Sequence, residues 1–185
     1  MPDALHFTGD ADADALLARD PLALLIGFVL DQQVTVQKAF RGPLDLKARL
    51  GRLDAAEIAG LDPERLLELF QEKPALHRFP GSMAKRVQEL AGVIAEEYGG
   101  DAARVWSEAT DSDDLRRRLS ALPGFGEMKV RTLASVLSRR LGVALAEPLA
   151  PTHRTLGDVD SPEALLEYQS AKRAAKAAKR AAATA

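Results

Sequence analysis

The sequence predicts an all-α protein of nine or ten helices. Apolar residues make up 46% of the 185-residue chain and recur mostly at helical spacing, whereas strand-like alternation is hard to find. The longest apolar stretch, Leu22 to Leu30, is too short to cross a bilayer. The amino terminus lacks the basic start and small-residue cleavage site of a signal peptide. We therefore expect a globular, cytoplasmic protein.

Prolines, glycines and capping residues predict where the helices of the first half begin and end. Pro21 stops the first helix and suits the first position of the second, whose stripe is Leu22, Leu25, Ile26 and Val29. The Gly42-Pro43 pair must break or kink the third helix. Aspartates that can act as N-caps precede the next two helices. The predicted helices span residues 10–19, 21–30, 35–50, 54–59, 63–72 and 82–97.

The second half begins with a capped helix that ends at residue 121, followed by a sharp turn and a helix over 127–141. Pro148 and Pro151 make residues 144–156 an irregular loop. The run Asp160-Ser161-Pro162-Glu163 combines a cap with proline at the first helical position, so it begins the last helix.

Charge is distributed unevenly along the chain. The net charge is -2, but all 27 acidic residues lie at or before Glu167. Five basic residues and no acid follow: Lys172, Arg173, Lys176, Lys179 and Arg180. We divide the chain into a helical domain over residues 1–171 and a basic Ala/Lys-rich tail over 172–185, helical or disordered. The tail suits either an anionic partner or a solvated, frayed helix.

Cysteine is absent from the chain, and there are only three histidines. This excludes disulfides, zinc sites with thiolate ligands and iron–sulfur clusters ligated by cysteine. A dedicated transition-metal site is not expected either.

The stretch LPGFGEMKV at residues 122–130 places a proline and two glycines between two helices. Gly124 and Gly126 permit positive φ angles or close approach of another backbone. The second helix offers unpaired N-terminal amides, which together with the helix dipole suit a phosphate. An ordinary helix–helix corner, in which glycine only makes the turn, is the alternative.

The stretch LPGFGEMKVRTLASVL resembles the hairpin of the helix-hairpin-helix HhH-GPD superfamily of base-excision DNA glycosylases. Two further stretches agree in order and spacing over roughly residues 20–145. LLIGFVLDQQVTV, from Leu24, is similar to the Gln-Gln helix junction of the 3-methyladenine (AlkA-like) branch. GSMAKRV, from Gly81, is similar to a small-residue turn before a lysine-bearing helix, within a family that also includes endonuclease III-like enzymes.

The resemblance implies a two-lobed all-α fold with duplex DNA across a cleft; the predicted hairpin motif spans residues 112–141. It implies that the amides of Gly124, Gly126 and Lys129 hold phosphate, with Phe125 and Arg131 beside them. Gln33, and less so Gln32, would probe the gap left by a flipped base, although the pair could simply cap a helix junction. The carbonyls of Ser120, Leu122 and Phe125 would hold a monovalent cation, K⁺ or Na⁺.

A weaker internal echo aligns residues 79–87 with the hairpin at 122–130. It would place Lys85 and Arg86 against a second phosphate. Chance similarity between two Pro-Gly turns before amphipathic helices explains the echo equally well.

Two departures from the family pattern concern catalysis. Bifunctional members carry a lysine nucleophile where this chain has Met128, and one residue turns a helix by roughly 100°, so we expect Lys129 to point away from the pocket. The position of the catalytic aspartate is occupied by Pro151. Glu147 and Asp158 are the candidate substitutes, against ordinary roles as a surface carboxylate and a turn or cap. His153 and Arg154 would contact DNA or a carboxylate.

The sequence therefore predicts a monomeric, monofunctional DNA glycosylase without an iron–sulfur cluster. It would bind duplex DNA and hydrolyse the N-glycosidic bond of a damaged, alkylated base. The alternative is an inactive module of the same fold that binds DNA or senses damage. A helical scaffold for a protein partner is a third, weaker alternative.

Overall fold

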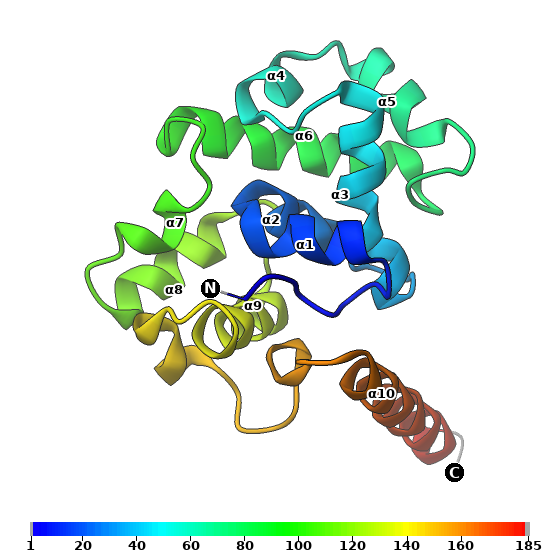
Figure 1. The fold of residues 1–185 in the computed structure, drawn as a ribbon, viewed down its shortest axis with the longest axis vertical. Helices are drawn as coiled ribbons and strands as arrows, with labels where there is room; N and C mark the ends of the chain where they lie inside the picture. Colours follow the sequence, from blue (N-terminus) through cyan, green and yellow to red (C-terminus); the bar gives the residue numbers. More distant parts are fainter. Residues whose placement is uncertain (1, 184–185) are drawn as a thin grey trace.

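The computed structural model describes residues 2–183, and within them every regular element is a helix and there is no strand (Figure 1). This confirms the all-α prediction. The α-helices are α1 (Ala11–Arg19), α2 (Pro21–Leu30), α3 (Val36–Leu50), α4 (Ala55–Gly60), α5 (Pro63–Gln71), α6 (Pro80–Glu97), α7 (Arg104–Ser107), α8 (Ser112–Ala121), α9 (Glu127–Arg139) and α10 (Pro162–Ala183). Two 3-10 helices, η1 (Ala144–Leu149) and η2 (Leu156–Asp158), lie between α9 and α10.

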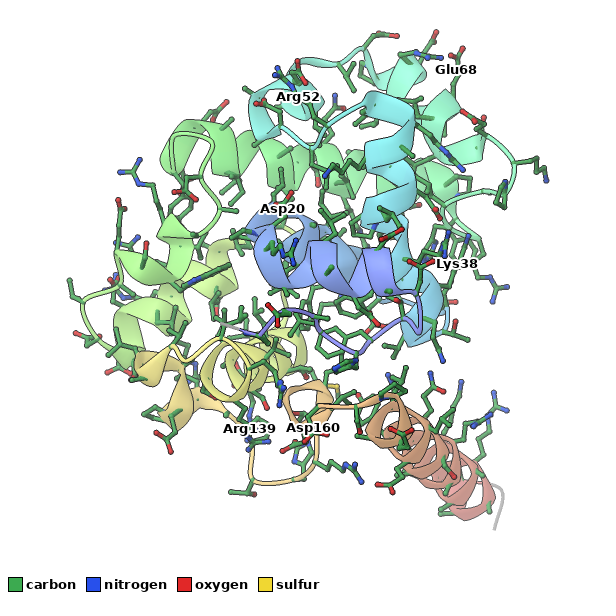
Figure 2. All side chains as sticks on the ribbon, viewed as in Figure 1. Asp20, Lys38, Arg52, Glu68, Arg139 and Asp160 are labelled. Atoms are coloured by element: carbon green, nitrogen blue, oxygen red, sulfur yellow. The ribbon has the colours of Figure 1, made fainter. Side chains whose placement is uncertain are left out.

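The helices pack as two lobes (Figure 1). In the first lobe, α4 and α5 pack on α6, and α2 packs on α1, α3 and α6. In the second, α9 packs on α8, η1 and η2, and α7 packs on α8. One continuous apolar core runs through both lobes, while charged side chains such as Arg52 and Glu68 point to solvent (Figure 2). No helix within residues 2–183 has the length and apolarity needed to cross a bilayer.

Helix α2 lies at the centre of the fold. Its N-cap, Asp20, accepts hydrogen bonds from the amides of Leu22 and Ala23. Every residue from Leu22 to Leu30 is buried, so the helix is buried on all sides and the single apolar stripe predicted for it is too narrow. The Phe28 ring packs against Phe40 of α3 at 5.1 Å and faces Phe125 of the hairpin at 6.3 Å. α2 thereby joins the two lobes.

Of the break or kink predicted at Gly42-Pro43, the break is wrong, because α3 runs from Val36 to Leu50 with Pro43 inside it. A proline within a helix removes one backbone hydrogen bond. Here packing of α3 on α2 compensates, since Gly42 lies against the Leu30 side chain and Gly27 lies against the Phe40 ring. Tertiary contact overrides the local preference.

The chain after α9 is more ordered than the predicted loop over 144–156, since η1 occupies its first part. The short helix α7 is absent from the sequence prediction. The last helix, α10, runs from Pro162 to Ala183, so the predicted boundary between residues 171 and 172 lies inside a continuous helix.

The contact between η2 and α9 leaves no room for a side chain at Gly157. A Cβ atom there would lie 2.2 Å from the Ser135 Oγ and 2.5 Å from the Ser135 backbone carbonyl. We expect Gly157→Ala to cost about 1–3 kcal/mol, as overpacking does. For a chain of this length that lowers the Tm by roughly 3–10 °C. Thermal unfolding followed by circular dichroism would measure the shift.

Gly92→Ala is the matched control for Gly157→Ala. Gly92 lies inside α6 and a Cβ atom there would meet nothing within 4 Å. Alanine is the better helix former by about 1 kcal/mol, so this variant should melt at an equal or higher temperature. Equal Tm values for Gly157→Ala and the wild type would contradict the packing argument.

Candidate nucleic-acid interface

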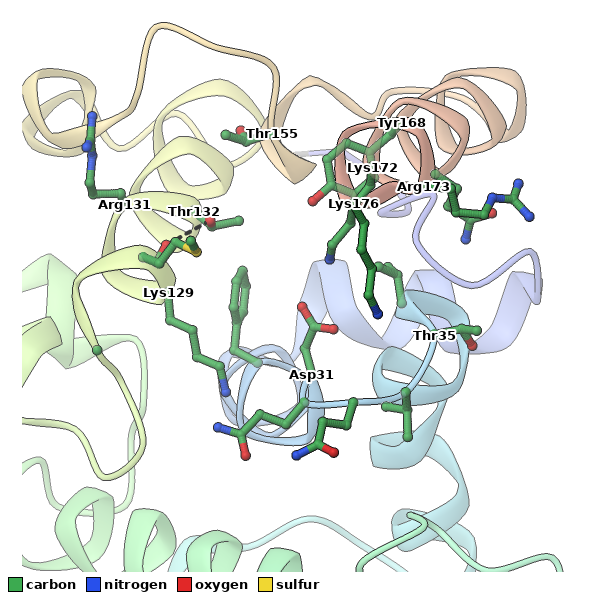
Figure 3. Close-up of a pocket in the computed structure, with 18 of the residues that line it drawn as sticks. Asp31, Thr35, Lys129, Arg131, Thr132, Thr155, Tyr168, Lys172, Arg173 and Lys176 are labelled. Carbon is green, nitrogen blue, oxygen red and sulfur yellow. Dashed lines mark hydrogen bonds between the residues drawn. The ribbon is translucent and has the colours of Figure 1, made fainter. Parts of the chain in front are cut away.

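A cleft of about 1580 Å³ opens between the end of α2, the start of α9 and one side of α10 (Figure 3). Two of its lining residues are acidic, Asp31 and Glu127, against eight lysines or arginines. The basic residues are Arg78, Lys129, Arg131, Arg154, Lys172, Arg173, Lys176 and Arg180. The whole chain has a net charge of -2, so folding gathers positive charge in this cleft. Such a cleft attracts a polyanion.

The hairpin between α8 and α9 forms one wall of the cleft. Gly124 has a φ of 82°, the left-handed region that favours glycine, and Gly126 is the N-cap of α9. The amides of Gly124, Gly126 and Lys129 donate no hydrogen bond within the described chain. A Cβ atom at Gly124 or Gly126 would meet nothing within 4 Å. The hairpin therefore presents free amides on an open surface.

Most other helices of the fold begin differently, because a side chain caps them. Asp10, Asp20, Thr35, Asp54, Asp62 and Asp111 accept amides at the starts of α1 to α5 and of α8. Helices α6, α7 and α9 have no side-chain cap. The starts of α6 and α9 are the two that the internal echo in the sequence aligns.

The Gln32-Gln33 turn forms the opposite wall. Gln33 is exposed and has a φ of 56°, the single positive φ among the described non-glycine residues. Such a conformation is uncommon outside glycine and clusters at functional sites. Gln32 differs, because its Oε1 accepts a hydrogen bond from Arg86 at 2.6 Å. Gln33 therefore presents an exposed side chain at the cleft, whereas Gln32 is held by Arg86.

A histidine outside the turn fixes its backbone. His77 is buried, with its Nδ1 accepting the Phe79 amide at 3.0 Å. This leaves Nε2 to donate to the Gln32 carbonyl at 2.9 Å, the arrangement of a neutral imidazole. Burial lowers the pKa of His77 and favours the same neutral form. The sequence analysis did not identify His77, because it lies 45 residues from the turn.

Lys129 does not point away from the pocket as predicted, since its side chain lies in the cleft (Figure 3). Its Nζ donates to the Val29 carbonyl at 3.4 Å. Burial lowers its pKa, an effect that Asp31 opposes. The buried stripe of α9, beginning at Val130, sets the rotation of the helix and leaves Lys129 on the flank that faces α2. Met128 also borders the cleft, with an exposed fraction of 80%.

Helix α10 forms the third wall. Its buried residues are Ala164 and Leu165, so the rest of the helix is free to present polar side chains. The Lys172 ammonium lies 5.8 Å from the centre of the Tyr168 ring. Burial, and then the charge of Asp31, raise the pKa of Tyr168 to about 12, so its hydroxyl keeps its proton. Lys172 and Lys176 extend from α10 toward Asp31 (Figure 3).

The carboxylates suggested by the sequence lie outside the cleft. Asp158 accepts two hydrogen bonds from Arg139, at 2.6 and 2.5 Å, and closes a capping box with Thr155. Glu147 is an exposed residue of η1. Pro151 is buried, and its carbonyl accepts a hydrogen bond from Arg139. None of the three lines the cleft, although His153 and Arg154 do.

Two carboxylates do line the cleft, and the sequence analysis identified neither: Glu127 is exposed and pairs with Arg116 at 2.9 Å, whereas Asp31 is partly buried. The available signal for Asp31 was its place, at the end of a fully apolar helix and directly before Gln32 and Gln33. Of the predicted basic residues, Lys129 and Arg131 line the cleft. Lys85 does not, and its ammonium faces Glu89 at 3.9 Å.

The carbonyls suggested as cation ligands lie at the turn after α8. Ser120 belongs to the last turn of α8, where helical carbonyls lack a partner within the helix. The Leu122 carbonyl accepts the Phe125 amide at 3.1 Å and keeps a second lone pair. Neutral oxygens of this kind fit a hard monovalent cation.

Comparison with protein families matched residues 26–182 to a known family. The matching family is described as HhH-GPD superfamily base excision DNA repair protein. Searches among curated proteins and among solved structures gave no match. The match includes α3 to α10 and the second half of α2, and with them the Gln-Gln turn and the hairpin. The chain belongs to the HhH-GPD superfamily of base excision DNA repair proteins.

Proposed function

We propose that the protein is a monofunctional DNA glycosylase that hydrolyses the N-glycosidic bond of a damaged, alkylated base in duplex DNA. The observation that carries this proposal is a single basic cleft with two opposed walls. One wall presents the free amides of the hairpin, which suit a phosphate. The other presents Gln33 on a strained backbone, which suits the gap left by a flipped base.

Alkylated purines fit the chemistry of this cleft. Their base is already cationic, so it can leave without protonation by a strong general acid. A carboxylate and a water molecule are then enough for hydrolysis. A monovalent cation held by the carbonyls of Ser120, Leu122 and Phe125 would reduce repulsion between those carbonyls and the DNA phosphate. We expect the protein to act on DNA as a monomer.

A second candidate function is a DNA-binding or damage-sensing module without catalysis. The observation that favours it is the absence of Pro151, Glu147 and Asp158 from the cleft lining. In this case the hairpin and Gln33 would bind damaged duplex without releasing the base.

A glycosylase assay separates the two functions. Labelled duplexes, each with one lesion (an alkylated purine, hypoxanthine, uracil or 8-oxoguanine), would be incubated with the protein and analysed with and without alkali. Breaks that need alkali are the expected result and support the monofunctional enzyme. Breaks without alkali would overturn that mechanism and point to an amine nucleophile, for which Lys129 would be the first candidate. Salt-sensitive binding with no breaks on any lesion would favour the binding module.

A further inference from the structure

Asp31 is held in place by its backbone, and its side chain is turned into the cleft. Its amide donates to the Gly27 carbonyl at 3.0 Å, and the next amide, that of Gln32, donates to the Leu30 carbonyl at 2.7 Å. The carboxylate is partly buried and lies between Lys129 of α9 and the Tyr168 and Lys172 side chains of α10 (Figure 3). Three elements therefore converge on one carboxylate.

The two buried carboxylates of the described chain, Asp14 and Asp114, have clear structural partners. Asp14 accepts the amides of Phe7 and Thr8 at 3.0 and 2.9 Å. Asp114 accepts hydrogen bonds from Arg117 and Arg118, each at 3.0 Å. These two groups fix loops and helix ends, so their burial is explained by the fold.

Asp31 has no such partner, because no side chain within residues 2–183 donates a hydrogen bond to its carboxylate or forms an ion pair with it within 4.0 Å. Burial raises its pKa, and the charges of Lys172 and Lys129 oppose that shift only partly. Removing a carboxylate from water without a hydrogen-bonded partner is costly. A group kept at such a cost inside a binding cleft is typical of a reaction site.

We propose that Asp31 is the catalytic carboxylate of the cleft and activates the water that attacks C1′ of the damaged nucleotide. The proposal rests on the glycosylase function proposed above. It assigns to the C-cap of α2 the group missing from the family's usual position, where this chain has Pro151.

The step balances for a cationic alkylated base. The water oxygen forms a bond to C1′ while the C1′–N bond breaks. The electron pair of the C1′–N bond leaves with the base, which thereby becomes neutral. The proton released by the water passes to the Asp31 carboxylate. Lys129 and Lys172 stabilise the ionised form of Asp31 before the step and face the phosphates of the bound strand.

The test compares Asp31→Asn with the wild type in single-turnover release of a 7-methylpurine from a labelled duplex. Asparagine keeps the shape and removes the charge. We expect at least about a hundredfold loss of rate, within the range of general-base effects, and a DNA dissociation constant within threefold of wild type. The wild-type rate should rise as pH rises through the elevated pKa of Asp31. The rate of the variant should lose that dependence.

Two controls exclude a structural effect. Asp12→Asn, an exposed position of α1 outside the cleft, should react like the wild type. The Tm of Asp31→Asn should be equal or higher at neutral pH. A carboxyl with a raised folded-state pKa is destabilising once the pH exceeds that pKa, and asparagine removes this cost.

The outcomes separate this proposal from the one on which it rests. If the wild type is active and Asp31→Asn reacts within threefold of the wild-type rate, the role of Asp31 is overturned and the glycosylase function stands. A large loss of both rate and DNA binding would also overturn it, in favour of a role in binding. A wild type that releases no lesion would overturn both proposals. Covalent trapping of the protein on DNA by borohydride would identify an amine nucleophile and contradict water activation.

Discussion

Replacing Gly126 with alanine should weaken duplex binding by at least about tenfold, which corresponds to 1.4 kcal/mol. Gly126 is the N-cap of α9, next to the amides that we assign to a DNA phosphate. Its φ of -75° suits any residue, and a Cβ atom there would meet no protein atom within 4 Å. The added methyl group therefore causes no strain in the free protein but occupies the space that a phosphate needs. Fluorescence anisotropy with a labelled duplex would measure the loss.

The comparison variants for Gly126→Ala are chosen by backbone geometry. Gly92→Ala adds the same methyl group to α6 and should bind DNA like the wild type. Gly124→Ala places alanine at a φ of 82°, so it should lower stability as well as binding. The Tm of Gly126→Ala should change by only a few degrees, because alanine is a slightly poorer N-cap than glycine. Unchanged affinity in Gly126→Ala would show that the hairpin does not approach the phosphate closely.

Removing the positive charges on the side of α10 that lines the cleft should have the second large effect on duplex binding. In the triple variant Arg173→Gln, Lys176→Gln and Arg180→Gln, three basic side chains that line the cleft lose their charge. If each contacts a phosphate, the slope of log K against log salt should fall by about 2.7, since each contact contributes about 0.9. Affinity at physiological salt should fall roughly tenfold to a hundredfold. Glutamine keeps helix propensity close to that of lysine and arginine, so α10 should persist.

A matched pair of single variants tests whether position on α10 matters or only charge. Lys176 lines the cleft, and Lys179, one turn further along the same helix, does not. Lys176→Gln should reduce the salt slope by about 1, and Lys179→Gln should leave it nearly unchanged. Equal effects of the two changes would indicate a diffuse electrostatic contribution. Only the hairpin and the Gln32-Gln33 turn would then act as position-specific walls of the cleft, and α10 would not.

The fold class could be predicted because its signals are local. Capping aspartates such as Asp20 and Asp54 stand directly before the helices that they begin. Gly124 adopts the positive φ that the hairpin pattern permits, and the family match covers nearly all of the stretches on which the resemblance rested. The error at Gly42-Pro43 came from the same local rule, because the packing of α3 on α2 cannot be deduced from neighbouring residues.

The site was only partly predictable. Its two main motifs, the hairpin and the Gln-Gln turn, are contiguous in sequence, and they proved to face one cleft. His77 and Tyr168 act across 45 and more than 100 residues, so no spacing rule points to them. The prediction that Lys129 points away from the pocket took the turn of one helical residue from Met128 and so assumed a rotation of α9. The buried stripe that begins at Val130 sets the true rotation.

The sequence by itself determined most of the helices, the hairpin and the family, because helix caps, glycine torsions and apolar spacing act over a few residues. Only the tertiary structure decided which charges meet. It placed Asp158 on Arg139 and away from the cleft, and it brought together Asp31 from the end of α2, Lys129 of α9 and Lys172 of α10. The physical reason is that burial and electrostatic environment depend on contacts through space, which join residues that are distant along the chain.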